Sequence, residues 1–424
     1  MLMNIVSDLI RFLEGSPTCF HAIKNTETEL ERHGFTRLSE NEAWSLTPGG
    51  SYYVTRNGSS LIAFTIPAGS WSSMHILASH SDSPCFKIKE HPELETEGHY
   101  IRLNVERYGG MILAPWLDRP LSVAGRVIVK DAGTGTYTMK LVNIDRDLVL
   151  IPNLAIHMNP DANKGYTYNP QKDMLPLYGT LSAKDTFMKT IARAAGVEES
   201  DILGHDLFLY NREKASIWGA DQEFLSCGRL DDLQCAFASL AGFLAGKKET
   251  YLNLHCVFDN EEVGSGTRQG AASTFLYDTL TRIFLGLGRS TEDYLISLAD
   301  SMMISADNAH AVHPNHPDKA DPSNRPYLGE GIVIKYNASQ KYCTDGISTA
   351  MFRDLCREAG VPVQTFANRS DMAGGSTLGN ISNTQVPLNT IDIGLPQLAM
   401  HSPYETASVK DTEYLVRAAK EFFA

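Results

Sequence analysis

The sequence predicts an α/β protein in which helices cover a sheet, with an antiparallel β module inserted into the main domain. From residue 228 onward, helical segments alternate with short apolar strands, a rhythm typical of βαβ units. Between about Gly98 and Pro160 the chain is instead rich in β-branched and aromatic residues. Its 424 residues also exceed the usual size of one compact core, so we expect about two or three domains.

The N-terminal region reads as one helix followed by strands. Apolar residues at helical spacing run through 4–14, and Gly-Ser-Pro at 15–17 ends this helix. Strands are expected at 52–54, 61–66 and 74–78, because turn residues separate these apolar stretches. A first cluster of potential metal ligands directly follows the last strand.

The inserted module should contain a β-hairpin, because apolar strands at 126–130 and 136–142 flank the turn sequence Asp-Ala-Gly-Thr-Gly. The module separates the first ligand cluster from the others. We therefore expect a discontinuous main domain, residues 1–92 plus 220–424, and an inserted domain, residues 93–219. The further elements expected are helices at 184–196, 233–245 and 271–285, and strands at 252–258 and 302–306.

Composition and charge argue against several classes of partner. The formal net charge of -13 provides no basic surface for nucleic acid or anionic lipid. The longest apolar stretch, 236–245, falls short of the roughly 20 residues that span a bilayer. The N-terminus lacks the basic segment of a secretory signal, and the 7 cysteines form no C-x-x-C pair. We expect a cytoplasmic protein with reduced thiols.

Five short stretches end in potential metal ligands. They are His80-Ser-Asp82, Asp231, Glu261-Glu262, Asp307 and His401. Two adjacent zinc ions need a bridging carboxylate, one imidazole each, further carboxylates and one spare acid for proton transfer. The set offers all of these groups, although each stretch alone is more often structural.

The individual stretches leave alternatives open. Glu261 and Glu262 follow a strand and should lie at the carboxyl edge of a sheet, where an extended backbone would point them in opposite directions. A solvated acidic turn is the alternative. The spacing of His80 and Asp82 lets the aspartate accept the second ring N–H of the histidine. Asp231 precedes an apolar helix, where it could simply be an N-cap.

A rival metal cluster is His310, His313 and His316, but Pro314 and Pro317 disrupt any helix that could align the three rings. No H-E-x-x-H motif occurs, and no glycine-rich loop has the spacing of a nucleotide-binding motif. A single-zinc helix protease and a nucleotide-binding protein are therefore not predicted.

Six ordered motifs together resemble the successive signatures of the aspartyl aminopeptidase family of dinuclear zinc exopeptidases. They are HSDSP (80–84), GRLDDL (228–233), DNEEVGSGT (259–267), SADNAHAVHPNHP (305–317), NRSDMAGGSTLG (368–379) and MHSPYE (400–405). Three further segments resemble the family in order, namely 12–22, 108–127 and 151–158, so the similarity covers nearly the whole chain.

The resemblance implies a role for each candidate residue. His80 and Asp307 would bind one zinc ion, Glu262 and His401 the other, and Asp231 would bridge both. Glu261 would act as general base on a water between the metals, with Asp82 also catalytic. Co²⁺ or Mn²⁺ could replace Zn²⁺ at such ligands. The expected reaction is hydrolysis of the N-terminal residue from peptides, with a preference for Asp or Glu.

The resemblance also implies architecture and assembly. The main domain would be a central mixed sheet flanked by helices, of the zinc-exopeptidase type, and the insertion a β-barrel-like domain for dimerisation and substrate access. Family members assemble from dimers into dodecamers, and we carry to His157 the histidine that reaches a neighbouring subunit's site. Lys335 and Tyr342 are candidates for recognising an acidic side chain.

Two departures from the family pattern bear on specificity. Asn153 stands where some relatives have His, and Pro403-Tyr404 stands where many have an apolar residue and Arg. A broader-specificity aminopeptidase is therefore one alternative, and a catalytically silent assembly protein that keeps the fold is another. The presence of every candidate ligand and of Glu261 argues against silence.

Overall fold

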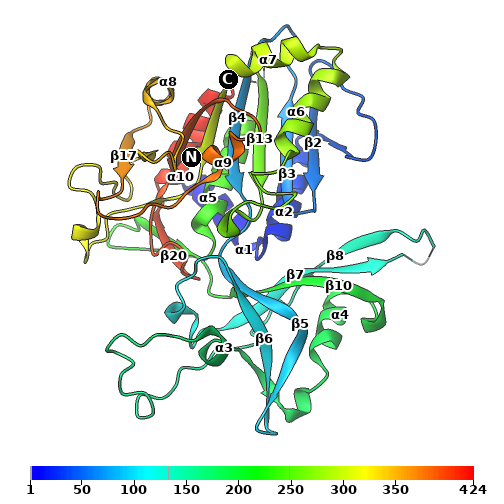
Figure 1. Ribbon diagram of the computed structural model, residues 1–424, viewed down its shortest axis with the longest axis vertical. Coiled ribbons are helices and arrows are strands. Elements are labelled where there is room, and N and C mark those ends of the chain that lie inside the picture. Colours follow the sequence, from blue (N-terminus) through cyan, green and yellow to red (C-terminus); the bar gives the residue numbers. More distant parts are fainter. Residues whose placement is uncertain (1, 132, 248) are drawn as a thin grey trace. The chain divides into compact units, whose positions relative to one another are not determined.

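A computed structural model describes residues 2–131, 133–247 and 249–424 (Figure 1). The chain forms two compact units. The first comprises Met1–Asp82, Ala215–Met400 and Glu405–Ala424, and the second comprises Ser83–Lys214 and His401–Tyr404. Among the described residues, no helix has both the length and the apolarity required to cross a membrane.

A nine-stranded mixed sheet forms the centre of the first unit, with the order β1-β2-β3-β13-β4-β14-β18-β16-β17. Its four central strands run parallel to one another, and β3 pairs antiparallel to β13. The strands are β1 (Thr36–Leu38), β2 (Ser51–Arg56), β3 (Ser60–Thr65), β4 (Met74–His80), β13 (Leu252–Phe258), β14 (Met302–Ala306), β16 (Ile332–Tyr336), β17 (Val363–Ala367) and β18 (Asn389–Gly394).

A second, five-stranded sheet in this unit has the order β11-β12-β20-β19-β15. The strands are β11 (Ser216–Trp218), β12 (Phe224–Cys227), β15 (Ala309–His310), β19 (Pro396–Leu398) and β20 (Glu405–Ser408). β15 begins three residues after β14 ends, so only a short connection links the carboxyl edge of the large sheet to this small sheet.

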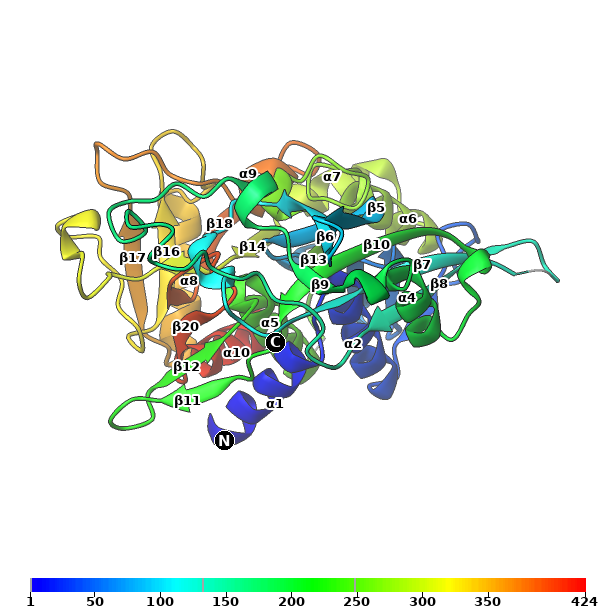
Figure 2. The same ribbon diagram turned by 90° about the horizontal axis from the view of Figure 1, so that it is seen from below.

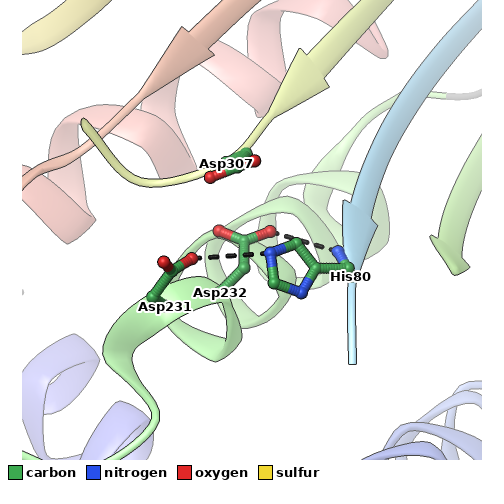
Figure 3. Close-up of side chains that lie close together, drawn as sticks. All are labelled: His80, Asp231, Asp232 and Asp307. Carbon is green, nitrogen blue, oxygen red and sulfur yellow. Dashed lines mark hydrogen bonds and ion pairs between the residues drawn. The ribbon is translucent and has the colours of Figure 1, made fainter. Parts of the chain in front are cut away.

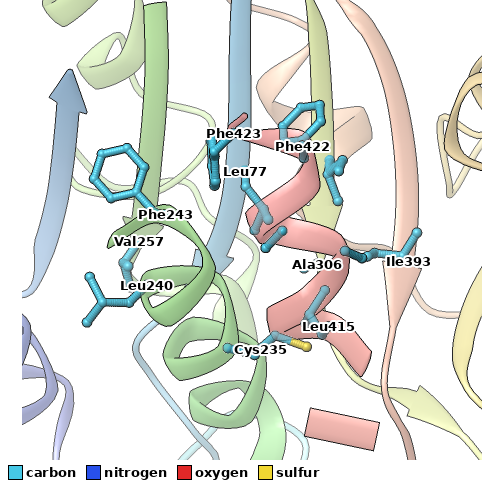
Figure 4. Packing of buried hydrophobic residues seen from close by; sticks show 14 of the residues in the cluster. Leu77, Cys235, Leu240, Phe243, Val257, Ala306, Ile393, Leu415, Phe422 and Phe423 are labelled. Carbon is cyan, nitrogen blue, oxygen red and sulfur yellow. The ribbon is translucent and has the colours of Figure 1, made fainter. Parts of the chain in front are cut away.

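Helices cover both faces of the large sheet, because the central strands are apolar on both faces. Along β13, Leu254, Cys256 and Phe258 join one buried cluster, whereas Val257 between them joins another. The first face carries α6 (Phe275–Gly286), α7 (Thr291–Ala299) and α9 (Leu378–Ser382), and the second carries α2 (Cys19–Arg32), α5 (Leu230–Ala245), α8 (Gly346–Ala359) and α10 (Asp411–Phe422). Phe243 of α5 packs there beside Phe423, just beyond α10 (Figure 4). α1 (Leu2–Glu14) belongs to a smaller cluster with α5 and β12.

The second unit is a six-stranded antiparallel sheet with the order β8-β7-β10-β5-β6-β9. The strands are β5 (Cys85–Thr96), β6 (Tyr100–Tyr108), β7 (Leu121–Lys130), β8 (Tyr137–Asn143), β9 (Leu177–Thr180) and β10 (Ile202–Asn211). α3 (Pro170–Asp173) is a single turn, and α4 (Phe187–Ala195) packs beside β8 (Figure 2).

The mixed α/β fold, the helix at 4–14 and the hairpin at 126–142 are confirmed. Strands 252–258 and 302–306 have the predicted bounds, and the helix expected at 184–196 begins three residues later. In the described residues, β8 and β9 are the two edge strands of the second unit's sheet and do not pair with each other, so barrel-like closure stays a prediction.

Candidate metal centre

Adjacent parallel strands deliver predicted ligands to one edge of the large sheet. His80 is the last residue of β4 and pairs with Phe258, the last residue of β13. Asp307 directly follows β14, which runs parallel to β4 on its other side. Because parallel strands end at the same edge, stretches far apart in sequence meet there.

His80 is buried, and both of its ring nitrogens face oxygen atoms. Nδ1 lies 3.1 Å from the backbone carbonyl oxygen of Asp82 and 3.4 Å from its Oδ1. Nε2 lies 3.4 Å from Oδ1 of Asp231 (Figure 3). A carbonyl oxygen only accepts hydrogen bonds, so Nδ1 carries a hydrogen, and the Nε2 of a neutral ring points its lone pair at a carboxylate.

Two acceptors in that arrangement need a proton or a metal cation between them. In a tetrahedral zinc site with bonds of about 2.1 Å, two ligand atoms lie about 3.4 Å apart. The separation of His80 Nε2 from Asp231 Oδ1 is 3.4 Å and therefore fits zinc. The predicted bond to Asp82 is shared between its backbone and side-chain oxygens.

Asp231 reaches the site because the first turn of α5 is not regular. Its φ and ψ are −82° and 108°, those of Asp232 are −117° and 17°, and the residue that precedes the helix is Arg229 in the left-handed region. The side chain of Arg229 itself makes no capping hydrogen bond. Oδ1 of Asp231 lies 3.4 Å from Nε2 of His80, so its carboxylate faces the site, and the N-cap interpretation stays an alternative.

The expectation that Glu261 and Glu262 lie on an extended segment is wrong. They begin a 3₁₀ turn, Glu261–Val263, between Asn260 at φ 62° and Gly264 at φ 95°. The carboxylate of Asp82 holds this turn, because its Oδ1 accepts the N–H of Glu261 and its Oδ2 that of Glu262, each at 3.1 Å. Asp82 thus contacts both the imidazole of His80 and the acidic turn.

Within the first unit, two overlapping groups have ligand atoms within 4.8 Å of one another. One joins His80, Asp231, Asp232 and Asp307, and the other joins His80, Glu261 and Glu262. Sequence reasoning missed Asp232, although the adjacent acids of GRLDDL were a signal. Its Oδ2 accepts the backbone N–H of His80 at 3.1 Å, so it ties β4 to α5.

The site buries more negative charge than a protein alone readily stabilises. Burial, followed by repulsion from Asp307, raises the pKa of Glu261 to about 8. Burial and neighbouring carboxylates also raise the pKa values of Glu262, Asp232 and Asp307. Burial alone would lower the pKa of His80, but Asp231 and Asp82 outweigh it and raise the pKa well above its ordinary value. Cations would relieve this excess.

Lys335 and Tyr342 lie beside this cluster. Lys335 is buried, and its Nζ is 3.5 Å from Oδ1 of Asp307 and 5.5 Å from the ring centre of Tyr342. Burial alone would lower the pKa of Lys335, but Asp307 outweighs burial and raises it. The lysine is therefore a charged partner of the site, and its role towards a substrate stays a prediction.

His401 and His157 belong to the second unit. His401 has φ 68°, and its Nδ1 lies 2.7 Å from the backbone oxygen of Gly110. His157 lies in an exposed turn. Their proposed functions also stay predictions. His310, His313 and His316 form no metal-binding group in the part of the chain that the structure describes.

An imidazole and several buried carboxylates at the carboxyl edge of an α/β sheet are typical of metal-dependent hydrolases. The chain also resembles known proteins over its whole length. A family model described as "Aminopeptidase I zinc metalloprotease (M18)" matches residues 12–423. A "Probable M18 family aminopeptidase 2" of Clostridium acetobutylicum is 45% identical over 427 residues, covering 99% of each chain.

Solved structures agree with this assignment. Ape4, solved in complex with Nbr1, has a TM-score of 0.96 and 36% identity, covering 100% of this chain and 86% of that one. The S. cerevisiae mApe1 dodecamer has a TM-score of 0.87 and 29% identity, covering 99% of this chain and 96% of that one. The chain belongs to the M18 family of zinc metalloaminopeptidases and is a hydrolase.

Proposed function

We propose that this protein removes the N-terminal residue from peptides with two zinc ions per subunit and prefers Asp or Glu at that position. The observation that carries the proposal is the buried group around His80, whose Nε2 and the Oδ1 of Asp231 are spaced as two ligands of one ion. A metal centre also accounts for the clustering of carboxylates whose pKa values burial raises.

The proposed ligands divide between two ions. His80 and Asp307 would hold one, Glu262 and His401 the other, and Asp231 would bridge them. When bound, zinc acts as a Lewis acid that polarises the scissile carbonyl and lowers the pKa of a neighbouring water. Nitrogen and oxygen ligands also suit Co²⁺ or Mn²⁺, which are possible substitutes.

Glu261 is the proposed general base. Its carboxylate would take a proton from the attacking water and then pass it to the departing amine. Asp82 contributes by position, since it holds the backbone N–H of Glu261 and faces the Nδ1 of His80. One carboxylate therefore fixes the positions of both Glu261, the proposed base, and His80, a proposed zinc ligand.

The preference for acidic residues rests on Lys335 and Tyr342. Lys335 brings a buried positive charge to the cluster, and the ring of Tyr342 lies beside it. Asp307 already neutralises part of that charge at 3.5 Å. A broader specificity is therefore the alternative, and a panel of aminoacyl substrates distinguishes the two.

We also propose that the protein is a homo-oligomer, a dodecamer built from dimers; the similar S. cerevisiae mApe1 is a dodecamer. Residues 93–219 would mediate dimerisation and substrate access. His157 lies in a segment whose apolar side chains are exposed: Leu154 is 51%, Ile156 50% and Met158 71% exposed. Contact with a second copy would cover them and bring His157 to its site. A cytoplasmic location stays a prediction.

The decisive experiment is the Glu261→Gln variant, which removes the base but keeps the shape. We expect zinc content and assembly like wild type, with turnover lowered at least 100-fold, since general acid–base catalysis contributes about 10²–10⁴-fold. Glu292→Gln, an exposed position in α7, is the matched control. Unchanged turnover in Glu261→Gln would remove Glu261 from the mechanism, and a silent assembly protein would show no turnover in wild type.

A further inference from the structure

One peptide group beside the candidate metal centre is held at both ends by buried side chains. The group joins Leu230 to Asp231, where the first turn of α5 departs from helical angles. Its carbonyl oxygen accepts from Nδ2 of Asn308 at 3.0 Å. Its N–H donates to Oε2 of Glu405 at 3.1 Å. The orientation of this peptide plane therefore depends on two residues from other parts of the chain.

The two holding residues are themselves connected. Nδ2 of Asn308 donates to Oε1 of Gln397 at 2.9 Å, and Nε2 of Gln397 donates to Oε1 of Glu405 at 3.4 Å. The hydrogen bonds thus close a ring that starts and ends at one peptide group. Asn308 is 2% exposed, and Gln397 and Glu405 are each 1% exposed, so water does not compete for these bonds.

The direction of every bond in the ring is fixed. The carbonyl oxygen of Leu230 only accepts, so the amide nitrogen of Asn308 must face it, and the thiol of Cys235 donates to Oδ1 of Asn308 at 3.0 Å. The same amide nitrogen faces Oε1 of Gln397 at 2.9 Å and Oε1 of Gln234 at 3.1 Å. Gln397 then accepts through its oxygen and donates through its nitrogen to Glu405. A flip of either amide would place like groups against each other. The ring consequently has one favoured arrangement.

We propose that Asn308, Gln397 and Glu405 are positioning residues that set the direction of the Asp231 carboxylate and thereby the zinc affinity of the site. The inference rests on the proposed zinc centre. A tilt of the peptide plane before Asp231 changes its φ and moves its side chain away from His80, whose Nε2 is 3.4 Å from Asp231 Oδ1. Groups that orient metal ligands typically contribute about 10- to 100-fold in metal affinity.

The test is zinc affinity, measured by competition with a chromogenic chelator, for the full-length Gln397→Met variant. Methionine matches glutamine in length but can neither accept from Asn308 nor donate to Glu405, and it changes no charge. We expect about a 10- to 100-fold loss of zinc affinity. Glu405→Gln is the second variant, because its single acceptor oxygen can serve only one of the two donors. It should weaken zinc binding similarly.

Asn253→Leu is the matched control. Asn253 is also buried and donates to the backbone oxygen of Phe423 at 3.1 Å, but it lies at the start of β13, the end of the strand opposite the site. Its variant should lower the melting temperature without changing zinc affinity. Circular dichroism and melting temperatures of the zinc-free proteins show which variants are folded.

The outcomes separate this inference from the proposed function. A wild-type protein that binds no zinc contradicts the zinc centre itself. Wild-type binding together with equally tight binding by Gln397→Met overturns the positioning role, even if Glu405→Gln binds weakly, because the lost charge alone would then explain that result. An equal loss of affinity in Asn253→Leu also overturns it, since the effect would be general destabilisation. If Gln397→Met does not fold, Asn308→Ser replaces it with the same two expectations.

Discussion

Removing metal should make the stability of this protein depend on pH in a defined direction. Burial and Asp307 raise the pKa of Glu261 from its ordinary 4.5 to about 8 in the folded protein without metal. Below about pH 4.5 the carboxyl group is protonated in both the folded and the unfolded chain. As the pH rises towards 8, the unfolded chain ionises first, so the free energy of unfolding falls.

The magnitude follows from the difference between the two pKa values. At about 1.4 kcal/mol for each pH unit, Glu261 alone corresponds to a loss of roughly 5 kcal/mol in the free energy of unfolding between about pH 4.5 and 8. Burial shifts the pKa values of Glu262 and Asp232 in the same direction. Zinc reverses the effect, and each site at 100 times its dissociation constant adds about 2.7 kcal/mol of stability.

Scanning calorimetry between pH 5 and pH 8, with a chelator or with zinc, measures this directly. We expect the chelated protein to melt at lower temperature as pH rises, and the gap between the two forms to widen. Comparing the two forms cancels groups far from the site. The chelated Glu261→Gln variant should show a shallower pH dependence than the chelated wild type. A gap that stays constant across this range would refute the reasoning.

Three further predictions concern single residues. Lys335→Met leaves Asp307 without its buried cation, so the free energy of unfolding of the zinc-free protein should fall by about 3–5 kcal/mol in thermal unfolding. Zinc should restore much of this stability. An unchanged stability would show that the ion pair between Lys335 and Asp307 is not formed. Burial raises the pKa of Asp411 to about 7, although the N–H groups of Gly329 and Gly331 donate to its carboxylate and oppose this rise. Ionisation of Asp411 therefore lowers the free energy of unfolding between about pH 4 and 7, and Asp411→Asn should abolish this loss. An unchanged pH profile in that variant would contradict the role of Asp411. Phe243→Ala removes a fully buried ring that packs on Phe35 and Phe423. The free energy of unfolding should fall by about 3–5 kcal/mol in denaturation experiments. A loss below about 1 kcal/mol would show that neighbouring side chains fill the cavity.

Much of the fold was predictable because its signals are local. The strands 252–258 and 302–306 are short apolar runs bounded by polar or turn residues, and β13 and β14 have those bounds. The placement of His80 and Asp307 at one edge followed from their positions after apolar strands. Parallel pairing of β4 with β13 and β14 then makes them neighbours.

What could not be predicted depends on contacts between distant segments. The turn at Glu261 is held by a carboxylate 179 residues earlier in the chain, so no local pattern distinguishes it from a strand end. The sequence places Asp231 before a helix but does not show that its backbone N–H is held by Glu405, 174 residues later. Asn308 and Gln397 carry no periodic signal, because single buried amides leave no mark on hydrophobic patterning.

The same contacts explain why this edge of the sheet is polar although the strands behind it are apolar. Replacing Asn308, Gln397 and Glu405 with hydrocarbon side chains would remove the cost of burying these polar groups, and such replacements are often neutral or stabilising. An apolar edge could not, however, fix the peptide plane before Asp231 against rotation, because packing is less directional than hydrogen bonding. Stability and metal binding therefore make opposing demands on the same few residues. The protein satisfies both only if cations offset the charge that its folded chain concentrates around His80.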